Sequence, residues 1–330
     1  MNKIRLGVIG TGLAWERLHW PALQQLCGQY SVVAVCDREI EKARAAGARL
    51  GLAPDQIYDD HRVMLRRDDL DAVDVLVPIA ENFDVARDVI RAGKGLITEK
   101  PLAATLEGAR DLIALKNRHG TKMMVAENIR YEEYSDIIKD AVSGGQIGEV
   151  AYFIFNNGAD FEKSMTEDSF AAARWRQHPA FPGGVILDSC VHDIALLRYL
   201  FGDAQCLRAL AARQDKDYCP YRNINTSMRF SGGVIGSYSF WSSAAELSKP
   251  PVGLRIYGSL GEIVLESKEC GVVRIHYRDG RCEQKPFTPG KGFYRELLNF
   301  YDGNIVSTPE KELGDMELIF NILSLLEQQA

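Results

Sequence analysis

The fold is indicated most clearly by residues 4–14, which read IRLGVIGTGLA. The apolar run from Ile4 to Ile9 predicts a buried strand, and Gly10 and Gly12 follow it directly. Glycine at these two positions lets the backbone turn sharply and lets a ligand come close to it. A strand, a glycine turn and a helix in this order are typical of folds that bind the pyrophosphate of a dinucleotide.

An acidic residue supports this interpretation. Asp37 ends the second predicted strand, 25 residues beyond Gly12, which is near the spacing at which a carboxylate hydrogen-bonds the adenosine ribose. A carboxylate favours NAD because it repels the extra phosphate of NADP, whereas the neighbouring Arg38 can pair with that phosphate. The sequence predicts NAD or NADP, with NAD slightly favoured. Two turn glycines in an unrelated α/β protein are the alternative.

The rest of the first part of the chain alternates between short apolar runs and helix-like stretches. Such alternation predicts a parallel sheet with right-handed crossovers. The predicted strands are residues 4–9, 32–36, 73–77, 95–98 and 123–126.

Beyond a further helix near residues 132–142 the pattern changes to short strand-like runs, which predict a mainly antiparallel sheet. These runs are residues 152–156, 207–212, 226–230, 234–240, 253–257, 262–266 and 272–277. Two helices, residues 292–301 and 315–327, are expected at the end. The predicted fold class is an α/β Rossmann domain (residues 1–125) plus an α+β C-terminal domain (residues 126–330) with a large, open sheet.

Composition limits the function classes. The chain has 330 residues, 46% of them hydrophobic, and a net charge of −6 without a block of Lys and Arg. Nucleic acid is therefore not an expected partner. We expect no membrane association and a cytoplasmic location, because neither a spanning apolar run nor a secretory signal is present. Seven cysteines without a CxxC pair predict reduced, buried thiols, and no metal is expected.

Three polar residues are candidates for chemistry. Lys100 directly follows the fourth predicted strand, where a lysine can stabilise negative charge that develops on a substrate oxygen. Asp188 and His192 are four residues apart in a segment with helical periodicity, so they project from one face. A carboxylate beside an imidazole suits a general base. A solvated loop lysine and a plain helix-face pair are the alternatives.

The chain resembles the Gfo/Idh/MocA family of NAD(P)-dependent oxidoreductases over nearly its whole length. The resemblance rests on the glycine turn, on the stretches AGK (92–94), EKPL (99–102) and ENIRY (127–131), on the Gly-Gly and Asp-x-x-x-His-Asp helix (183–202), and on the hairpin YGSLGEIVLE (257–266). In that family the lysine, aspartate and histidine are usually the substrate-site trio. The resemblance thus implies that Lys100 holds and polarises the reacting oxygen, His192 moves the proton and Asp188 orients His192.

The same match implies the remaining site residues. Cofactor contacts are expected from Gly10, Thr11, Gly12, Leu13, Ala14, Asp37, Arg38, Pro78, Asn82, Glu99 and Lys100. Substrate contacts are expected from Lys100, Asn128, Arg130, Tyr131, Arg176, Asp188 and His192. Arg176 lies in RWRQH (174–178), which can clamp an anion, although such arginines more often form domain-interface ion pairs.

Three positions depart from the family pattern. Trp15 stands where the third fingerprint residue is small, Asn82 stands where a histidine is frequent, and Cys190 stands where a glycine is common. A ring at position 15 is expected to push the first helix away from the strand or to shift the cofactor, and Pro21 is expected to kink that helix. The cofactor contacts on the nicotinamide side are expected to differ as well.

The leading hypothesis is oxidation or reduction of a secondary alcohol or ketone on a sugar, cyclitol or related polyol. A non-catalytic dinucleotide-sensing regulator of the same fold and an imine or double-bond reductase are the alternatives. The resemblance also implies a homodimer or homotetramer. We expect its interface on the open sheet face, with aromatic residues such as Tyr238, Phe240 and Trp241.

Overall fold

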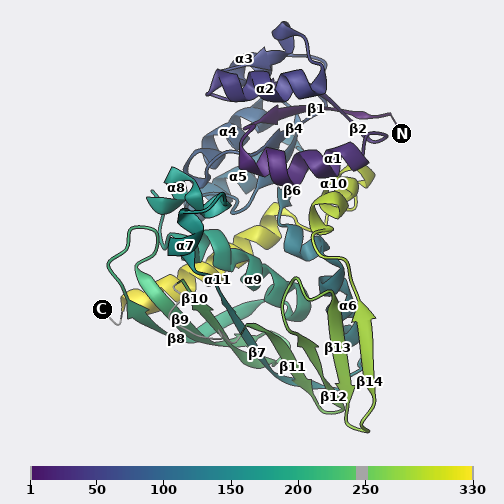
Figure 1. Cartoon of the computed structure of the whole chain (residues 1–330), viewed down its shortest axis with the longest axis vertical. Coiled ribbons are helices and arrows are strands. Elements are labelled where there is room, and N and C mark those ends of the chain that lie inside the picture. The colour runs from purple at the N-terminus through teal and green to yellow at the C-terminus, as the bar shows by residue number, and fades with distance from the viewer. Residues whose placement is uncertain (1, 243–251, 329–330) are drawn as a thin grey trace. The chain divides into compact units, whose positions relative to one another are not determined.

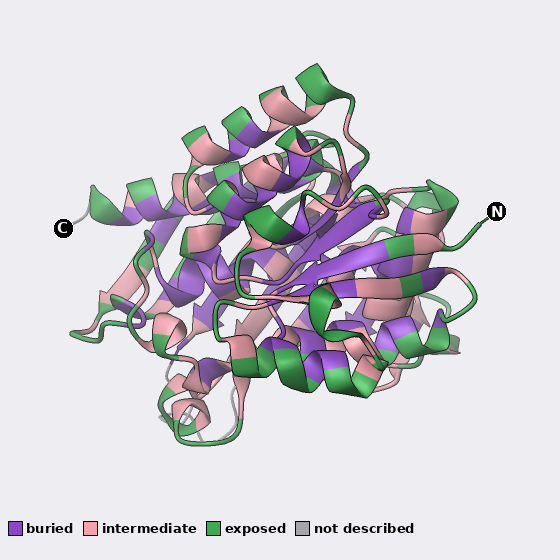
Figure 2. Ribbon diagram, turned by 90° about the horizontal axis from the view of Figure 1, so that it is seen from above, coloured by how far each residue is buried: buried purple, intermediate pink, exposed green. Residues whose placement is uncertain are grey.

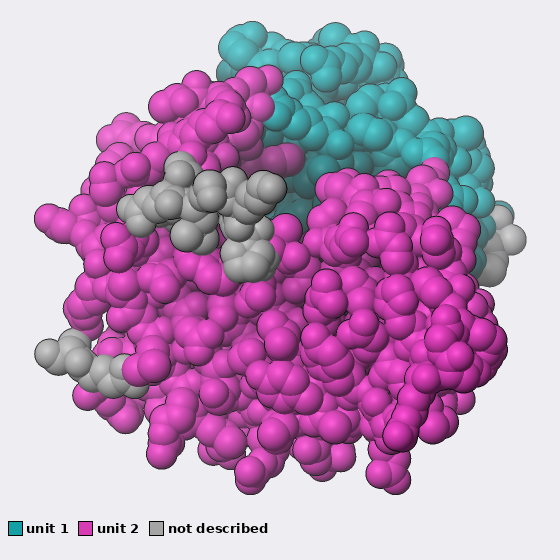
Figure 3. Space-filling model, turned by 60° about the horizontal axis from the view of Figure 1, so that its bottom comes forward, with its two compact units in different colours: residues 1–128, 293–313 teal, residues 129–292, 314–330 magenta. Residues whose placement is uncertain are grey.

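The chain forms two compact units, which Figure 3 colours separately. The first comprises residues 1–128 and 293–313, and the second comprises residues 129–292 and 314–330. The structure, a computed structural model, describes residues 2–242 and 252–328. The return of residues 293–313 to the first unit had no signal in the sequence. The predicted boundary after residue 125 stays a prediction.

The first unit contains a parallel sheet with the strand order β3-β2-β1-β4-β5-β6 (Figure 1). The strands are β1 (Ile4–Ile9), β2 (Tyr30–Cys36), β3 (Ile57–Tyr58), β4 (Ala72–Val75), β5 (Gly95–Glu99) and β6 (Met123–Ala126). This order is that of a Rossmann fold, whose ligand lies at the carboxyl ends of the strands where the order reverses, between β1 and β4. The predicted fold class is confirmed for this part. Strand β3 was missed because two residues carry no periodicity.

Helices flank these strands, with buried residues on the sheet and exposed residues on the outer helix faces (Figure 2). Both α2 and α5 end at a glycine in the left-handed conformation, as expected for helix C-termini. The helical segments are η1 (Trp15–His19), α1 (Trp20–Gln25), α2 (Ile40–Leu50), η2 (Pro54–Gln56), α3 (His61–Met64), α4 (Ile79–Arg91), α5 (Leu106–His119), η3 (Asn128–Tyr131) and α10 (Gly292–Asp302).

The first helix departs from regular geometry where the sequence predicts a disturbance. Its η1 segment is a π-turn, closed by the Trp20 N–H, which donates to the Trp15 carbonyl five residues earlier. Pro21 is the second residue of α1, directly after the π-turn, and it has no N–H to donate to the preceding turn. The Trp15 ring is 1% exposed and lies 5.4 Å from the Trp20 ring. The indole is therefore part of the hydrophobic core.

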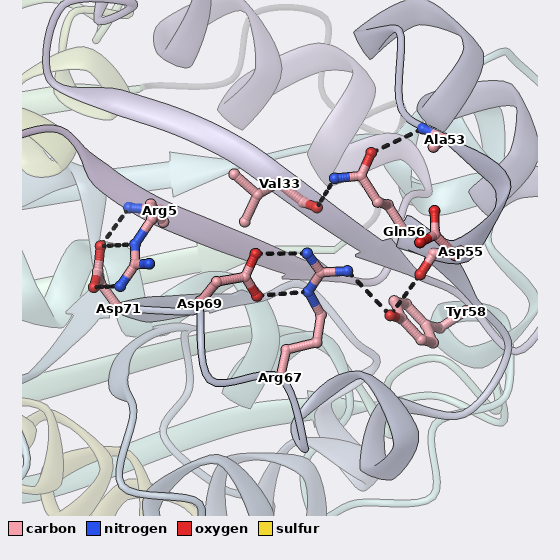
Figure 4. Close-up of polar contacts among 9 residues, drawn as sticks. All are labelled: Arg5, Val33, Ala53, Asp55, Gln56, Tyr58, Arg67, Asp69 and Asp71. Atoms are coloured by element: carbon pink, nitrogen blue, oxygen red, sulfur yellow. Dashed lines mark hydrogen bonds and ion pairs between the residues drawn. The ribbon is translucent and has the colours of Figure 1, made fainter.

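Polar contacts tie the short β3 strand and its neighbours together (Figure 4). Arg67 pairs with Asp69 at 2.6 Å and donates to the Tyr58 hydroxyl at 3.2 Å. Arg5 pairs with Asp71 at 2.7 Å and so links β1 to the turn before β4. These partly exposed pairs stabilise strand ends that have few apolar contacts of their own.

The second unit contains an eight-stranded sheet with the order β14-β13-β12-β11-β7-β10-β9-β8. Its strands are β7 (Val150–Gly158), β8 (Ala204–Arg213), β9 (Tyr221–Phe230), β10 (Ile235–Trp241), β11 (Gly253–Gly258), β12 (Gly261–Leu265), β13 (Val272–Tyr277) and β14 (Cys282–Pro286). Only the pair β10 and β7 is parallel among the pairings of this sheet, so the predicted mainly antiparallel sheet is confirmed for the described residues. Strand β14, which is polar, was missed.

Two expectations about this unit need correction. Tyr238 and Phe240 are 0% and 2% exposed, and the Tyr238 hydroxyl donates to Asp193 on helix α9, so these rings belong to the covered face of the sheet. The predicted aromatic interface was wrong for them. The cysteines are all unpaired, but Cys27 and Cys282 are exposed and Cys270 is half-buried, so the prediction of buried thiols was wrong for these three.

The remaining helical segments are α6 (Glu133–Ser143), α7 (Phe161–Met165), η4 (Phe170–Ala172), α8 (Arg174–Gln177), α9 (Val185–Phe201) and α11 (Pro309–Glu327). They belong to the second unit, although α11 begins in the first, and η3 crosses the boundary after its first residue. Among the described residues, no helix is both long and apolar enough to cross a bilayer. The same part of the chain holds no group of three or more His, Cys, Asp or Glu residues arranged for a metal ion.

Candidate functional site

The glycine turn after β1 has the geometry of a ligand cradle. Gly10 has φ +93° and its backbone approaches so closely that a Cβ atom would lie 2.4 Å from the Leu76 carbonyl oxygen. At Gly12 a Cβ atom would meet nothing within 4 Å. The turn therefore requires glycine on its inner side and leaves open space on its outer side, where a pyrophosphate would lie against the start of the helix.

The acid at the end of β2 holds this turn in place. One oxygen of Asp37, Oδ2, accepts the Thr11 N–H at 2.8 Å, and the other, Oδ1, accepts the Glu39 N–H at 2.9 Å. Arg38 pairs with Glu81 of α4 at 2.6 Å. Both predicted ribose-side residues thus lie beside the glycine turn, and Glu81 competes with any phosphate for the guanidinium. Leu13, Ala14 and Pro78 are half-buried around the same strand ends.

Asn82 has a structural task that the sequence did not reveal. Its side chain is 1% exposed, and Nδ2 donates to the carbonyl oxygens of Glu99, Pro101 and Leu102 at 3.0, 3.2 and 3.3 Å. Its Oδ1 accepts from Thr98 Oγ1 at 2.7 Å. The amide is therefore committed to the loop that carries Lys100, and we do not retain Asn82 as a cofactor contact.

A buried histidine lies beneath the same loop. His19, from η1, is 0% exposed, and its ring nitrogens face Asp74 of β4 and Glu99 at the end of β5. His19 and Asp74 were not among the site residues predicted from the sequence. The available signal was Asp74 itself, because a carboxylate within an apolar central strand requires a buried partner.

In the second unit, Asp188 and His192 both lie on α9, as predicted. Asp188 is 5% exposed, and its Oδ2 accepts from Arg176 Nε at 2.7 Å. The Arg176 guanidinium also lies over the Trp175 ring, 4.3 Å from its centroid. Arg176 thus fixes the direction of the Asp188 carboxylate. The guanidinium is therefore less available to clamp a substrate anion. His192 is half-buried.

The residue after His192 anchors the helix to the sheet. Asp193 is 0% exposed and accepts from Asn157 of β7, Tyr238 of β10 and Lys268 after β12, each at 2.8 Å. Burial and the nearby Asp193 carboxylate raise the pKa of Tyr238 well above its usual range. Three donors on one carboxylate fix the rotation of α9 about its axis and therefore the direction of His192.

The other predicted substrate residues are Asn128, Arg130 and Tyr131. Arg130 is 3% exposed, and its guanidinium forms a buried ion pair with Asp315 of α11. Tyr131 is 2% exposed. Both side chains therefore contribute to the core of the second unit, and their substrate contacts stay predictions. Asn128 is half-buried and is the last residue of the first segment of the first unit. The convergence of Lys100 with Asp188 and His192 stays a prediction.

The glycine turn, the acid at the end of β2 and the Rossmann strand order define a dinucleotide-binding oxidoreductase of the two-domain type. Family models bear this out: residues 4–127 match "Oxidoreductase family, NAD-binding Rossmann fold" and residues 136–264 match "GFO/IDH/MocA C-terminal domain". The chain belongs to the Gfo/Idh/MocA family.

Known relatives extend over most of the chain. An uncharacterised protein of Saccharomyces cerevisiae is 27% identical over 326 residues, which is 95% of this chain and 90% of the relative. D-apiose dehydrogenase of Paraburkholderia graminis is 26% identical, over 85% of this chain and 72% of the relative. An oxidoreductase of Thermotoga maritima has the same fold, with a TM-score of 0.85, 24% identity and coverage of 97% and 96%. Further relatives are named as sugar reductases and as an inositol dehydrogenase.

Proposed function

We propose that this oxidoreductase transfers hydride between a nicotinamide dinucleotide and a secondary alcohol or ketone of a sugar, cyclitol or related polyol. The observation that carries the proposal is the Lys100 loop, which Asn82 fixes at the carboxyl end of β5, on the edge of the sheet where Rossmann folds bind ligands. The names of the relatives support the substrate class.

The residues of the first unit fit a dinucleotide. The open outer side of Gly12 leaves room for the pyrophosphate, and Asp37 lies where the ribose hydroxyls are expected. We favour NAD over NADP, because Glu81 already neutralises Arg38. When bound, the nicotinamide supplies the hydride chemistry, and the protein supplies orientation and charge.

The protein's own residues then divide the remaining work. The Lys100 ammonium donates to the reacting oxygen and stabilises the negative charge that grows there. His192 accepts or returns the hydroxyl proton, and Asp188, held by Arg176, keeps the imidazole directed. Trp15 and Cys190, which depart from the family pattern, are buried, 1% and 0% exposed. We favour catalysis over dinucleotide sensing because Lys100, Asp188 and His192 are all present, and a sensor does not need an acid-base group. We also propose a cytoplasmic location.

The test is a Lys100→Met variant assayed against a panel of sugars and polyols with NAD and NADP. We expect turnover to fall by about 10²-fold or more, while dinucleotide affinity is retained. Lys94→Met is a matched control, because Lys94 immediately precedes β5 and Lys100 immediately follows it. Equal activity of the two variants, or equal loss of turnover and dinucleotide affinity in Lys100→Met, would contradict the role of the lysine.

We further propose a homodimer or homotetramer formed through the open face of the eight-stranded sheet. Leu210, Ile235 and Tyr152 are 63%, 45% and 36% exposed. Strand register places them on the face opposite to Tyr238. Light scattering is expected to give a multiple of the chain mass, and Leu210→Glu combined with Ile235→Glu is expected to give the mass of one chain. A monomeric unmodified protein contradicts this proposal.

A further inference from the structure

A line of polar contacts runs from the interior of the first unit to Lys100. His19 Nδ1 lies 2.8 Å from Asp74 Oδ2, and His19 Nε2 lies 3.2 Å from Glu99 Oε1. The other oxygen of Glu99, Oε2, accepts the backbone N–H of Lys100 at 3.2 Å. Each contact in the series has hydrogen-bonding distance, so the imidazole is connected to the backbone of the lysine through one carboxylate.

The arrangement requires a proton on each ring nitrogen. A neutral imidazole carries one N–H and one lone pair, and the lone pair would here face a carboxylate oxygen. The imidazolium form gives both carboxylates a donor. Burial opposes this charge, but the charges and hydrogen bonds of Asp74 and Glu99 outweigh it and raise the pKa of His19 well above its usual value.

Further groups surround the imidazole. The Phe293 ring of α10 lies 5.9 Å from the His19 ring, and Glu296, on the same helix, is 0% exposed. Neither oxygen of Glu296 has a hydrogen-bond partner among the described residues. Burial, together with Glu99, Glu127 and Asp74, raises the pKa of Glu296 well above its usual range, although His19 acts in the opposite direction. A neutral Glu296 leaves the imidazolium to the two carboxylates that face it.

We propose that His19 is a positioning residue for Lys100: its imidazolium holds Glu99 between β4 and the lysine backbone and so fixes the start of the loop that presents the ammonium group. The inference rests on the proposed role of Lys100 in hydride transfer. Asn82 fixes the carbonyl groups of this loop, whereas Glu99 fixes its first N–H. The two supports are independent and complementary.

A structural role alone does not account for this choice of residues. Removing an imidazole and two carboxylates from water is costly, and apolar side chains of similar volume would fill the space at no such cost. Apolar side chains cannot, however, offer two opposed donors. The cluster therefore fixes the direction of the backbone where β5 ends and the Lys100 loop begins. A displacement of the lysine by about 1 Å would change turnover by about 10²-fold.

The test follows the Lys100 amine directly. Lysines are converted to ¹³C-dimethyl-lysine, which keeps their charge, and the Lys100 signal is identified by its loss in Lys100→Arg. Its chemical shift is compared in the unmodified sequence, in His19→Gln and in Glu296→Gln. The last variant is the matched control, because it replaces a neutral buried carboxyl with an amide of the same size in the same cluster.

We expect the Lys100 chemical shift to move in His19→Gln and to stay unchanged in Glu296→Gln. Turnover is expected to fall by about 10- to 100-fold in His19→Gln with dinucleotide affinity retained. An unchanged Lys100 signal in a folded His19→Gln protein overturns the proposal. If His19→Gln fails to fold, Glu99→Gln tests the same link. The Lys100 chemical shift is again expected to move, and an unchanged Lys100 signal in folded Glu99→Gln overturns the proposal.

A second measurement needs no variant. In protein labelled with ¹⁵N-histidine, both ring nitrogens of His19 are expected to carry protons at pH 8, and a neutral tautomer overturns the proposal. Because neither spectroscopic readout uses a substrate, these results stand even if no polyol is turned over. Absence of any activity would then count against the proposed function alone.

Discussion

Replacing Asn82 with alanine separates two roles for this residue. The substitution removes the donors to three buried carbonyl groups and the acceptor for Thr98. The amide group has only two hydrogens for three acceptors, so about three full hydrogen bonds are lost, each worth about 0.5–1.5 kcal/mol. We expect a loss of about 3 kcal/mol in the free energy of unfolding, which corresponds to about 6–12 °C in Tm for a unit of this size.

Urea denaturation followed by circular dichroism measures this loss, and Thr98→Val is the matched control. That variant keeps the shape of the side chain and the Asn82 donors but removes one hydrogen bond, so about 1 kcal/mol is expected. Because the freed loop carries Lys100, turnover is expected to fall while dinucleotide affinity stays nearly constant.

Two results would refute this reasoning. One is an Asn82→Ala protein no less stable than Thr98→Val. The other is a weaker affinity for NAD without loss of stability, which would restore Asn82 to the cofactor contacts that the sequence alone had predicted.

Three further predictions concern both units. Asp193→Asn is expected to lower the free energy of unfolding in urea by about 3 kcal/mol, because Lys268 loses its partner and a donor replaces an acceptor in a buried site. An unchanged free energy of unfolding would contradict the anchoring of α9. Glu296→Gln is expected to be more stable than the unmodified protein at pH 7.5 and equally stable near pH 4. The reason is that burial raises the pKa of Glu296, so the folded protein keeps a proton that the unfolded chain releases as the pH rises through the ordinary carboxyl pKa. An equal difference in stability at both pH values would exclude a raised pKa. Asp37→Ser is expected to raise the ratio of NADP affinity to NAD affinity at least about tenfold. Fluorescence titration with each dinucleotide measures this ratio, and an unchanged ratio would remove Asp37 from the ribose contacts.

The sequence predicted the elements whose signals are local. The apolar run before Gly10, the alternation of strands and helices up to residue 126, and the periodicity around Asp188 each reflect a repeat that neighbouring residues carry by themselves. The glycine turn could be predicted as well, because the backbone conformation of Gly10 excludes other residues.

The contacts that support the candidate site could not be predicted in this way. Asn82 and the carbonyl of Leu102 are 20 residues apart, and His19 and Glu99 are 80 apart. No periodicity reports such pairs, since they meet only once the sheet has formed. Tyr238 shows the same limit: alternation identifies two faces of a strand, but only the packing of α9 shows which face is covered.

The return of residues 293–313 to the first unit has a consequence for biosynthesis. The Tyr30 hydroxyl donates to the Leu297 carbonyl at 2.6 Å, and the Val125 N–H donates to the Ser307 carbonyl at 3.1 Å. A nascent chain that ends at residue 128 therefore has a Rossmann sheet that still lacks a helix and an edge contact. Residues 293–313 must be synthesised before that unit can reach its final stability, so a truncated gene that encodes residues 1–128 without residues 293–313 is a poor choice for recombinant expression.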